Sequence, residues 1–446
     1  MTANDVAAAA PPAYRDLNVL RWLAAYTASV TGDVMYFLAL TWSATRAAGP
    51  SQAGFVIMAA ALPRALLLLG GGVVADRFGP RRVAITSDAT RCLVILAAAA
   101  AVLHASPSLW LLIAVAVVFG VVDAVFMPAV GALPPRLTAS EQLARVQGMR
   151  GLSIRLSNFI GPLLAGAVLA SSGVAGTFTV AGVLFAASLL LLLTIRMRPL
   201  TPSSNEQAVP GTARQDLIDG LRYIRQHRTL APLVTMIGLS EMCFSGPVGA
   251  GLVLLADERG WGAAGMGWIA SAFSIGGATA GLLLTVSVRI PRAGLIMSGA
   301  LFVTAAGTVA LGHMSSLPSA VLLGALIGLT SGITMAVTSA LVQTEADPHY
   351  LGRVTAVTTL GTLGLAPVLF PAVGITVDRW GAAAFFTGSG GICLLAAALG
   401  ITFPVLRRAE LRTPNERTVV RELARPERRE GGRERRPGSR RRPKGL

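Results

Sequence analysis

Five charged residues stand out inside long apolar stretches of this sequence. They are Asp33, Arg64, Asp123, Arg155 and Glu241. An ionisable side chain inside a membrane span costs about 2.5–3.5 kcal/mol on insertion scales, so such groups usually face the interior of a helix bundle. The chemistry that carboxylates and guanidinium groups offer there is the uptake and release of protons and the attraction of charged solutes.

The depth of these charges predicts which of them pair. Asp33 and Arg64 each lie about ten residues, or roughly 15 Å of helix, from the outer ends of the first and second apolar stretches. Asp123 and Arg155 lie about eight or nine residues from the inner ends of the fourth and fifth stretches. We therefore predict the ion pairs Asp33–Arg64 and Asp123–Arg155. Glu241 has no obvious basic partner in its half of the chain.

Two interpretations of these charges remain open. The pairs are static and only lock helix packing, or one acid loses its partner during a conformational change, becomes desolvated and takes up a proton. Competition between proton and substrate for that acid would give antiport by linkage. Asp33, Asp123 and Glu241 are the candidate proton-coupling residues, with Arg64 and Arg155 as their partners. Glu241 is alternatively a site for a cationic substrate, or a permanently protonated, hydrogen-bonded acid.

The composition indicates a membrane protein. Of 446 residues, 53% are hydrophobic and 13% are charged, against about 25% charged in soluble proteins. The three cysteines and four histidines are scattered, which predicts no disulfide framework and no metal site. Neither a nucleophile with a partner base nor a phosphate-cradling loop ending in Gly-Lys-Ser/Thr is present. We therefore predict a protein that is not an enzyme and has no cofactor.

Apolar stretches of about 20 residues, the length that crosses a bilayer as a helix, recur twelve times. The first six cover residues 20–42, 54–74, 83–103, 109–130, 146–170 and 177–195. The second six cover residues 233–255, 266–286, 294–313, 320–342, 355–377 and 382–403. The sequence thus predicts an all-α membrane protein with twelve transmembrane helices.

Arginine placement predicts the orientation. Alternate loops and their edges carry Arg77, Arg81, Arg82, Arg136, Arg145, Arg196, Arg198, Arg222, Arg225, Arg228, Arg289, Arg292 and Arg353. The opposite loops hold only Arg46, Arg259 and Arg379. Because basic residues stay on the cytoplasmic side, we predict that both termini are cytoplasmic, in the plasma membrane of a bacterium.

The chain divides into five predicted segments. Residues 1–16 form a cytoplasmic N-terminal segment, 17–196 the first six-helix bundle and 231–406 the second. Similar residue patterns in the two halves predict pseudo-symmetric bundles around a central path. Residues 197–230 form a linker with an amphipathic helix on the cytoplasmic surface, in which Leu217, Leu221 and Ile224 recur at helical spacing, opposite Arg222, Arg225 and Arg228. Residues 407–446, with 15 basic and 6 acidic residues, form a disordered basic tail that we expect to contact anionic lipid rather than nucleic acid.

One loop carries a family signature. The segment between the second and third stretches begins at Gly72, continues through Asp76-Arg77 and Gly79, and ends at Arg81-Arg82. It resembles the signature loop of the major facilitator superfamily, with Pro80 in place of the first basic residue at its end. The resemblance implies that this loop latches the two bundles together on the cytoplasmic side, with Arg353 as a partner. We expect Asp88 and Arg91, one turn apart on the next helix, to support the latch.

Further residues resemble the branch of this superfamily that holds the enterobactin exporters and macrolide-efflux proteins. They are Ser29-x-x-Gly32-Asp33, Leu62-Pro63, Gly120-x-x-Asp123 and Gly161-Pro162 with Gly166. The last group is similar to the antiporter signature of the fifth helix, although Ser157 stands where another glycine is expected. The resemblance implies export in exchange for another solute.

The substrate cavity is weakly specified by the sequence. Flexible and aromatic side chains suit an adaptable apolar wall, and the candidates are Met35, Tyr36, Phe37, Phe126, Met127, Met242, Phe244 and Phe273. We predict a monomeric exporter of amphiphilic small molecules such as a drug, an antibiotic or a siderophore, driven by protons. The alternatives are a nutrient or sugar importer of the same fold and a sensor that transports nothing.

Overall fold

The computed structural model describes residues 12–105, 107–197, 213–286, 292–347 and 350–407. Most of the predicted N-terminal segment, the first part of the linker and the basic tail therefore lie outside the described residues. Within the described ranges the regular secondary structure is helical, with no strand.

Five long helices and two short turns form the first half. They are α1 (Leu17–Ala48), α2 (Pro50–Phe78), α3 (Pro80–His104), α4 (Leu109–Gly131), η1 (Pro134–Arg136), η2 (Ser140–Gln142) and α5 (Leu143–Thr194). The second half has α6 (Ala213–Gln226), α7 (Leu230–Gly246), η3 (Pro247–Gly251), α8 (Leu252–Glu258), α9 (Gly262–Val286), α10 (Ala293–His313), α11 (Leu317–Glu345), α12 (Leu351–Thr402) and α13 (Pro404–Arg407).

Glycine–proline pairs separate the first three helices. Gly49 and Gly79 both have a φ of 86°, a left-handed conformation that glycine adopts at low cost. Pro50 and Pro80 follow them as the first residues of α2 and α3, where proline's missing N–H would have no helical partner anyway. Each pair therefore ends one helix and starts the next without an intervening loop.

Two helices of 52 residues, α5 and α12, each contain two membrane spans. Each is kinked at a glycine with positive φ, Gly173 (66°) in α5 and Gly381 (80°) in α12. Both glycines lie 30 residues after the first residue of their helix, so the two halves match in register.

Counting these kinked helices as two spans each gives the predicted twelve. Eight helices are long and apolar enough to cross a membrane, and α2, bent by 66°, is a ninth. α5 and α12 contribute two spans each, and α7, η3 and α8 together form the remaining one. The prediction of an all-α membrane fold with twelve spans is confirmed.

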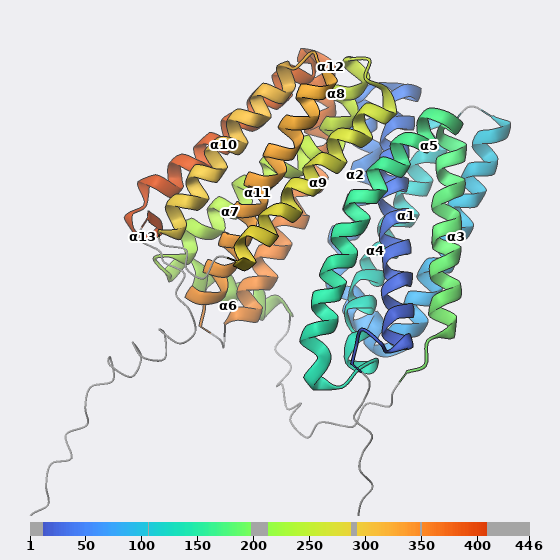
Figure 1. Cartoon of the computed structure of the whole chain (residues 1–446), viewed down its shortest axis with the longest axis horizontal. Helices are drawn as coiled ribbons and strands as arrows, with labels where there is room; N and C mark the ends of the chain where they lie inside the picture. The colour runs from blue at the N-terminus through green and yellow to red at the C-terminus, as the bar shows by residue number, and fades with distance from the viewer. Residues whose placement is uncertain (1–11, 106, 198–212, 287–291, 348–349, 408–446) are drawn as a thin grey trace, which may run out of the picture.

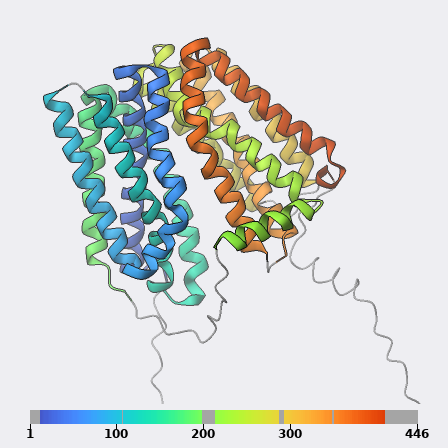
Figure 2. The same cartoon turned by 180° about the vertical axis from the view of Figure 1, so that it is seen from behind.

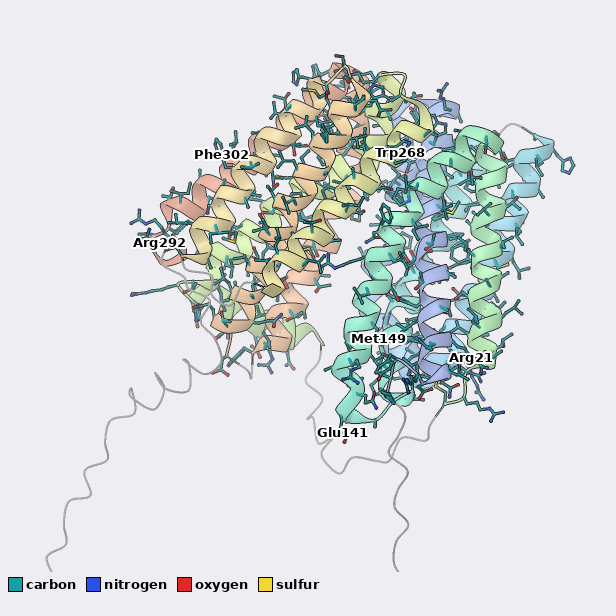
Figure 3. All side chains as sticks on the ribbon, in the orientation of Figure 1. Arg21, Glu141, Met149, Trp268, Arg292 and Phe302 are labelled. Carbon is teal, nitrogen blue, oxygen red and sulfur yellow. The ribbon has the colours of Figure 1, made fainter. Side chains whose placement is uncertain are left out.

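The spans form two bundles, α1–α5 and α7–α12, that lean together at one end and diverge toward the other (Figure 1). We call the diverging end, where α1 begins and α6 lies, the linker end, and the opposite end the far end. Figure 2 shows α6 crossing the linker end of the second bundle. Arg21 and Glu141 mark the linker end of the first bundle, and Arg292 that of the second (Figure 3).

The buried apolar cores follow the same division. One cluster contains residues of both bundles, among them Leu40, Leu254 and Phe370. At the linker end each bundle has its own cluster, around Trp22 in the first and Leu301 in the second. Burial of apolar surface thus joins the bundles only where they meet.

Two close seams join the bundles, and glycines form both. In the α5–α9 seam, a Cβ on Gly267 would lie 2.5 Å from Pro162 O, and one on Gly166 would lie 2.7 Å from Ala263 O. Only glycine permits so close an approach of two backbones.

The α2–α12 seam repeats this arrangement. A Cβ on Gly54 would lie 2.5 Å from Phe370 O, and one on Gly374 would contact Pro50 O. Pro162 and Phe370 each lie 19 residues after the start of their helices, and the glycines at 166 and 374 each lie 23 residues after it. The seams are therefore pseudo-symmetric counterparts.

Polar contacts reinforce the seams at the far end. Arg46 Nε lies 2.9 Å from Asp257 Oδ1, and Ser51 Oγ donates to Asp378 Oδ2 at 2.7 Å. Ser271 Oγ, on α9, donates to the carbonyl of Phe159 on α5 at 2.8 Å. These contacts hold the far end shut.

Candidate functional site

Arg91 of α3 is the centre of a charged cluster inside the first bundle. Its Nη1 lies 3.5 Å from Asp33 Oδ2 on α1 and 3.5 Å from Asp88 Oδ1 on α3. Its Nη2 donates to Asp123 Oδ1 on α4. One guanidinium group thus contacts three carboxylates from three helices.

Asp88 is the fixed member of this cluster. Its side chain is fully buried, and it accepts hydrogen bonds from Ser29 Oγ at 3.0 Å and Ser188 Oγ at 2.5 Å. Arg91 Nη1 also donates to Ser29 Oγ at 3.2 Å. Two hydroxyl groups and one guanidinium group thus surround the Asp88 carboxylate and fix its position.

Two aromatic rings hold Arg91 in place. The guanidinium carbon lies 4.0 Å from the ring centre of Phe126 and 5.7 Å from that of Phe185, distances at which cation–π attraction operates. The Arg91 side chain is 1% exposed. The arginine is therefore a rigid hub.

Asp33 and Asp123 are the more accessible acids. Their side chains are 27% and 19% exposed. Asp33 Oδ1 is buried and has no hydrogen-bond partner among the described residues. Asp123 Oδ2 lies 4.0 Å from Nη1 of Arg64, whose side chain is 38% exposed. These groups can change partners with less rearrangement than Asp88 and Arg91.

Glycine packing places Arg64 near Asp123. Gly120 on α4 lies directly against the carbonyl of Ala60 on α2. Because residues three or four apart share a helix face, Asp123 and Arg64 meet one turn further along.

The cluster carries one more acid than base. The three carboxylates of Asp33, Asp88 and Asp123 face the two guanidinium groups of Arg64 and Arg91, which leaves one formal negative charge. A buried charge without compensation is costly. A bound proton or a cationic ligand would balance it.

The predicted ion pairs are wrong. Asp33 contacts Arg91, and Asp123 contacts Arg91 and Arg64. Arg155 reaches across the α5–α9 seam, where its Nη1 donates to Gly277 O at 3.1 Å. The position of a residue along its helix gives its depth in the membrane but not the direction of its side chain. The prediction paired residues on helices adjacent in sequence, and neither pair forms in the structure.

The hub itself was missed. Asp88 and Arg91 were expected to support the latch loop, yet both lie in the buried cluster. The signal was present, because both are ionisable residues inside the apolar stretch at 83–103.

Glu241, on α7 of the second bundle, is half-buried. Its carboxylate makes no hydrogen bond or ion pair with any described residue. It lies outside the Arg91 cluster, so a ligand or proton is its available partner.

Several predicted cavity residues instead belong to the packed core. Met35 and Phe126 are 0% and 1% exposed, and Tyr36 stacks on Phe119 with ring centres 3.8 Å apart. These three do not form an adaptable wall in this arrangement, because aromatic and aliphatic neighbours enclose them.

The other predicted cavity residues are scattered. Phe37 meets Phe370 across the bundles, at 6.3 Å between ring centres, and Met127 is exposed. Phe244 and Phe273 line a small apolar pocket inside the second bundle. The side chain of Met242 lies outside the described residues.

The latch residues lie at the linker end without contact between the bundles. Asp76, Arg77 and Arg82 are exposed, and Arg81 Nη2 donates to Leu193 O of its own bundle at 2.8 Å. Gly79 ends α2, seven residues after Gly72. The latch stays a prediction, because the bundles diverge here.

Arg353 contacts the linker helix. Its Nη1 lies 3.9 Å from Asp219 Oδ2 on α6, and its guanidinium carbon lies 5.4 Å from the ring centre of Tyr350.

The antiporter-like residues lie at two helix interfaces. A Cβ on Gly161 would lie 2.8 Å from Val34 on α1, whereas Pro162 and Gly166 form the α5–α9 seam. Ser157 donates to the carbonyl of Thr27 at 3.0 Å. The motif thus connects α1, next to Asp33, with the second bundle.

Comparison with known proteins agrees with this architecture. The sequence model described as Major Facilitator Superfamily matches residues 22–371 and 239–438. The multidrug efflux pump Tap of Mycobacterium tuberculosis is 26% identical over 404 residues, covering 86% of this chain and 92% of Tap. The enterobactin exporter EntS of Salmonella typhimurium is 26% identical over 328 residues, covering 70% of this chain and 77% of EntS. Among solved structures, the xylose transporter XylE of E. coli has a TM-score of 0.65 at 15% identity, covering 89% of this chain and 98% of XylE.

Proposed function

The chain belongs to the major facilitator superfamily, and from that premise we propose that it exports amphiphilic small molecules in exchange for protons. The export takes place across the plasma membrane of a bacterium, by alternating access of a central site to the two sides. The acid surplus around Arg91 is the observation that supports proton exchange.

The coupling step takes place at Asp33 and Asp123. Asp88 and Arg91 stay fixed, while the partly exposed Asp33 and Asp123 bind either one proton or one cationic group of the substrate, which balances the surplus negative charge. Proton and substrate then bind in competition, and linkage between them drives export. Glu241 adds a second negative group that attracts a cationic substrate to the side of the second bundle.

The linker end is the cytoplasmic end in this proposal. Arginines concentrate there, which favours the cytoplasm, and the first and last described segments, before α1 and at α13, lie on that side. The described arrangement, sealed at the far end, then accepts substrate from the cytoplasm. Rocking of the bundles parts the two glycine seams and brings the latch residues Asp76 and Arg77 toward Arg353.

The similarity to Tap and EntS supports the direction of transport. Both are named as exporters, one of multiple drugs and the other of enterobactin. A broad range of substrates would make this chain similar to Tap, and a narrow range would make it similar to EntS. A nutrient or sugar importer is the alternative, against which stands the scarcity of Asn, Gln and Trp at the centres of the spans.

Accumulation of fluorescent dyes and antibiotics in an efflux-deficient bacterium tests the proposal. Cells expressing the chain are compared with cells expressing Asp33→Asn, each with and without a protonophore. Glu345→Gln, which removes one acid at the linker end of α11 outside the cluster, is the matched control.

We expect the chain and its control to lower accumulation, and the protonophore and Asp33→Asn to abolish the effect. Raised accumulation would contradict export. Efflux that survives both treatments would contradict proton coupling at Asp33.

A further inference from the structure

The linker helix α6 is attached to the second bundle along one face. Ile224 is 3% exposed, and a Cβ on Gly220 would lie 3.0 Å from Arg353 O. Tyr223 stacks on Tyr350 with ring centres 4.3 Å apart and planes 4° from parallel. This face of α6 is packed against the start of α12.

Polar contacts fix the same face. Asp219 pairs with Arg353 at 3.9 Å, and the Tyr223 hydroxyl accepts the backbone N–H of Asp347 at 3.1 Å. Asp219, the only acid of α6 whose side chain the structure describes, therefore contacts the bundle.

The opposite face of α6 combines two large apolar side chains with arginines. Ile218 and Leu221 are 46% and 51% exposed, and Arg222 and Arg225 are exposed as well. At 100° per residue these four share one side of the helix. The predicted pattern, in which Leu221 and Ile224 shared an apolar face opposite the arginines, is wrong for Leu221, because it points away from the bundle.

The position of α6 indicates what covers this face. Figure 2 shows the helix lying crosswise on the outside of the second bundle, at the level where its spans end. A helix in the plane of the membrane surface immerses its apolar side chains at the boundary of the acyl chains and places arginines among the phosphates. Such a layer offers a partner to both kinds of side chain on the exposed face.

We propose that this face of α6, formed by Ile218, Leu221, Arg222 and Arg225, binds the headgroups of anionic phospholipids. The described charges on the face are all positive, which complements the phosphate and the net charge of an anionic lipid. The proposal does not depend on the transported substrate or the coupling ion.

Lipid bound at this face is connected through α12 to the α2–α12 seam. Asp219, Gly220 and Tyr223 join α6 to the first residues of α12, and α12 is the helix that forms a seam with α2. Anionic lipid therefore stabilises one position of the α12 start.

Lipid selectivity of the full-length protein tests the proposal directly. The protein is reconstituted in phosphatidylcholine vesicles with traces of spin-labelled phosphatidylglycerol or phosphatidylcholine, and the immobilised fraction of each is measured. Arg222→Gln with Arg225→Gln is compared with Arg21→Gln with Arg196→Gln. The control pair removes the same charge from exposed arginines at the linker end of the first bundle.

Each arginine near an anionic surface contributes roughly fivefold to lipid affinity. We expect the α6 pair to lower the preference for phosphatidylglycerol about tenfold or more at its site, and the control pair to leave that site intact. A photoreactive phosphatidylglycerol analogue should label residues 213–228 in the unaltered chain, which locates the site independently of the variants.

Equal selectivity in the two double variants, with label absent from residues 213–228, would overturn the proposal. Cross-linking between two copies of the Leu221→Cys variant, in place of lipid labelling, would assign the face to a second copy of the chain and overturn the proposal equally.

Discussion

Replacing Gly267 by alanine perturbs the α5–α9 seam without altering any charge. The new Cβ would lie 2.5 Å from Pro162 O and 3.2 Å from the Cα of Gly166. Both neighbours are backbone atoms, so no side-chain rotation relieves the overlap. The helices must separate by about 1 Å at this point to reach ordinary van der Waals contact.

The expected magnitude follows from this overlap. Overpacking a close interface costs about 1–3 kcal/mol. The gain in helix propensity from glycine to alanine, about 1 kcal/mol, applies whether the seam is closed or parted and therefore cancels. The ratio of far-end-open to far-end-closed molecules should rise by about 5- to 150-fold.

Spin labels at two exposed far-end positions measure this ratio. Leu103 is the residue before the last of α3 in the first bundle, and His313 is the last residue of α10 in the second. We expect a longer distance between them to become populated in Gly267→Ala. Gly299→Ala is the matched control, because a Cβ at this α10 position meets nothing within 4 Å. Equal distance distributions in the two variants would refute the role of the seam in closing the far end.

Three further predictions concern the charged residues. Arg91→Gln removes the positive charge shared by three carboxylates, so we expect the free energy of unfolding to fall by about 3–5 kcal/mol. The unfolding temperature in detergent should fall, and it should fall less in Arg91→Lys; an unchanged temperature would contradict the role of the cluster. Arg155→Gln removes the hydrogen bond to Gly277 O across the α5–α9 seam, worth about 1 kcal/mol, so the far-end-open population should rise about fivefold in the same spin-label measurement. An unchanged distance distribution would contradict a role for this bond. Glu241→Gln should weaken the binding of cationic dyes by about tenfold and leave neutral dyes unaffected, as competition binding would show; equal weakening of both would argue for a structural role.

The fold could be predicted from the sequence because each transmembrane span is recognisable from its own residues. Twenty apolar residues cross a bilayer whatever their neighbours are, so even the two spans fused in α5, on either side of Gly173, were found. The pairing of charges could not be predicted, because it depends on how helices rotate about their axes. Close approaches at Gly120 and Gly267 set that rotation, and they involve residues far apart in the sequence.

The acid cluster shows a second limit. Asp88 and Arg91, one turn apart on the same helix, were expected to support the neighbouring latch loop. Three helices from different parts of the chain converge on Arg91, and only tertiary structure brings Asp33 and Asp123 to it. A single sequence does not carry that information.

The glycine seams separate the residues that guide the motion of the bundles from the residues proposed to bind the solute. Where the bundles meet most closely, one partner is a glycine and the other a backbone carbonyl, so these points of closest contact carry no side chain that could recognise a solute. In the proposed mechanism, substitutions at the acids and at Glu241 therefore change which compound is carried, while the glycine contacts that guide the motion stay the same. A change of transported compound would then require only a few substitutions in the bundle interiors, with the two glycine seams unchanged.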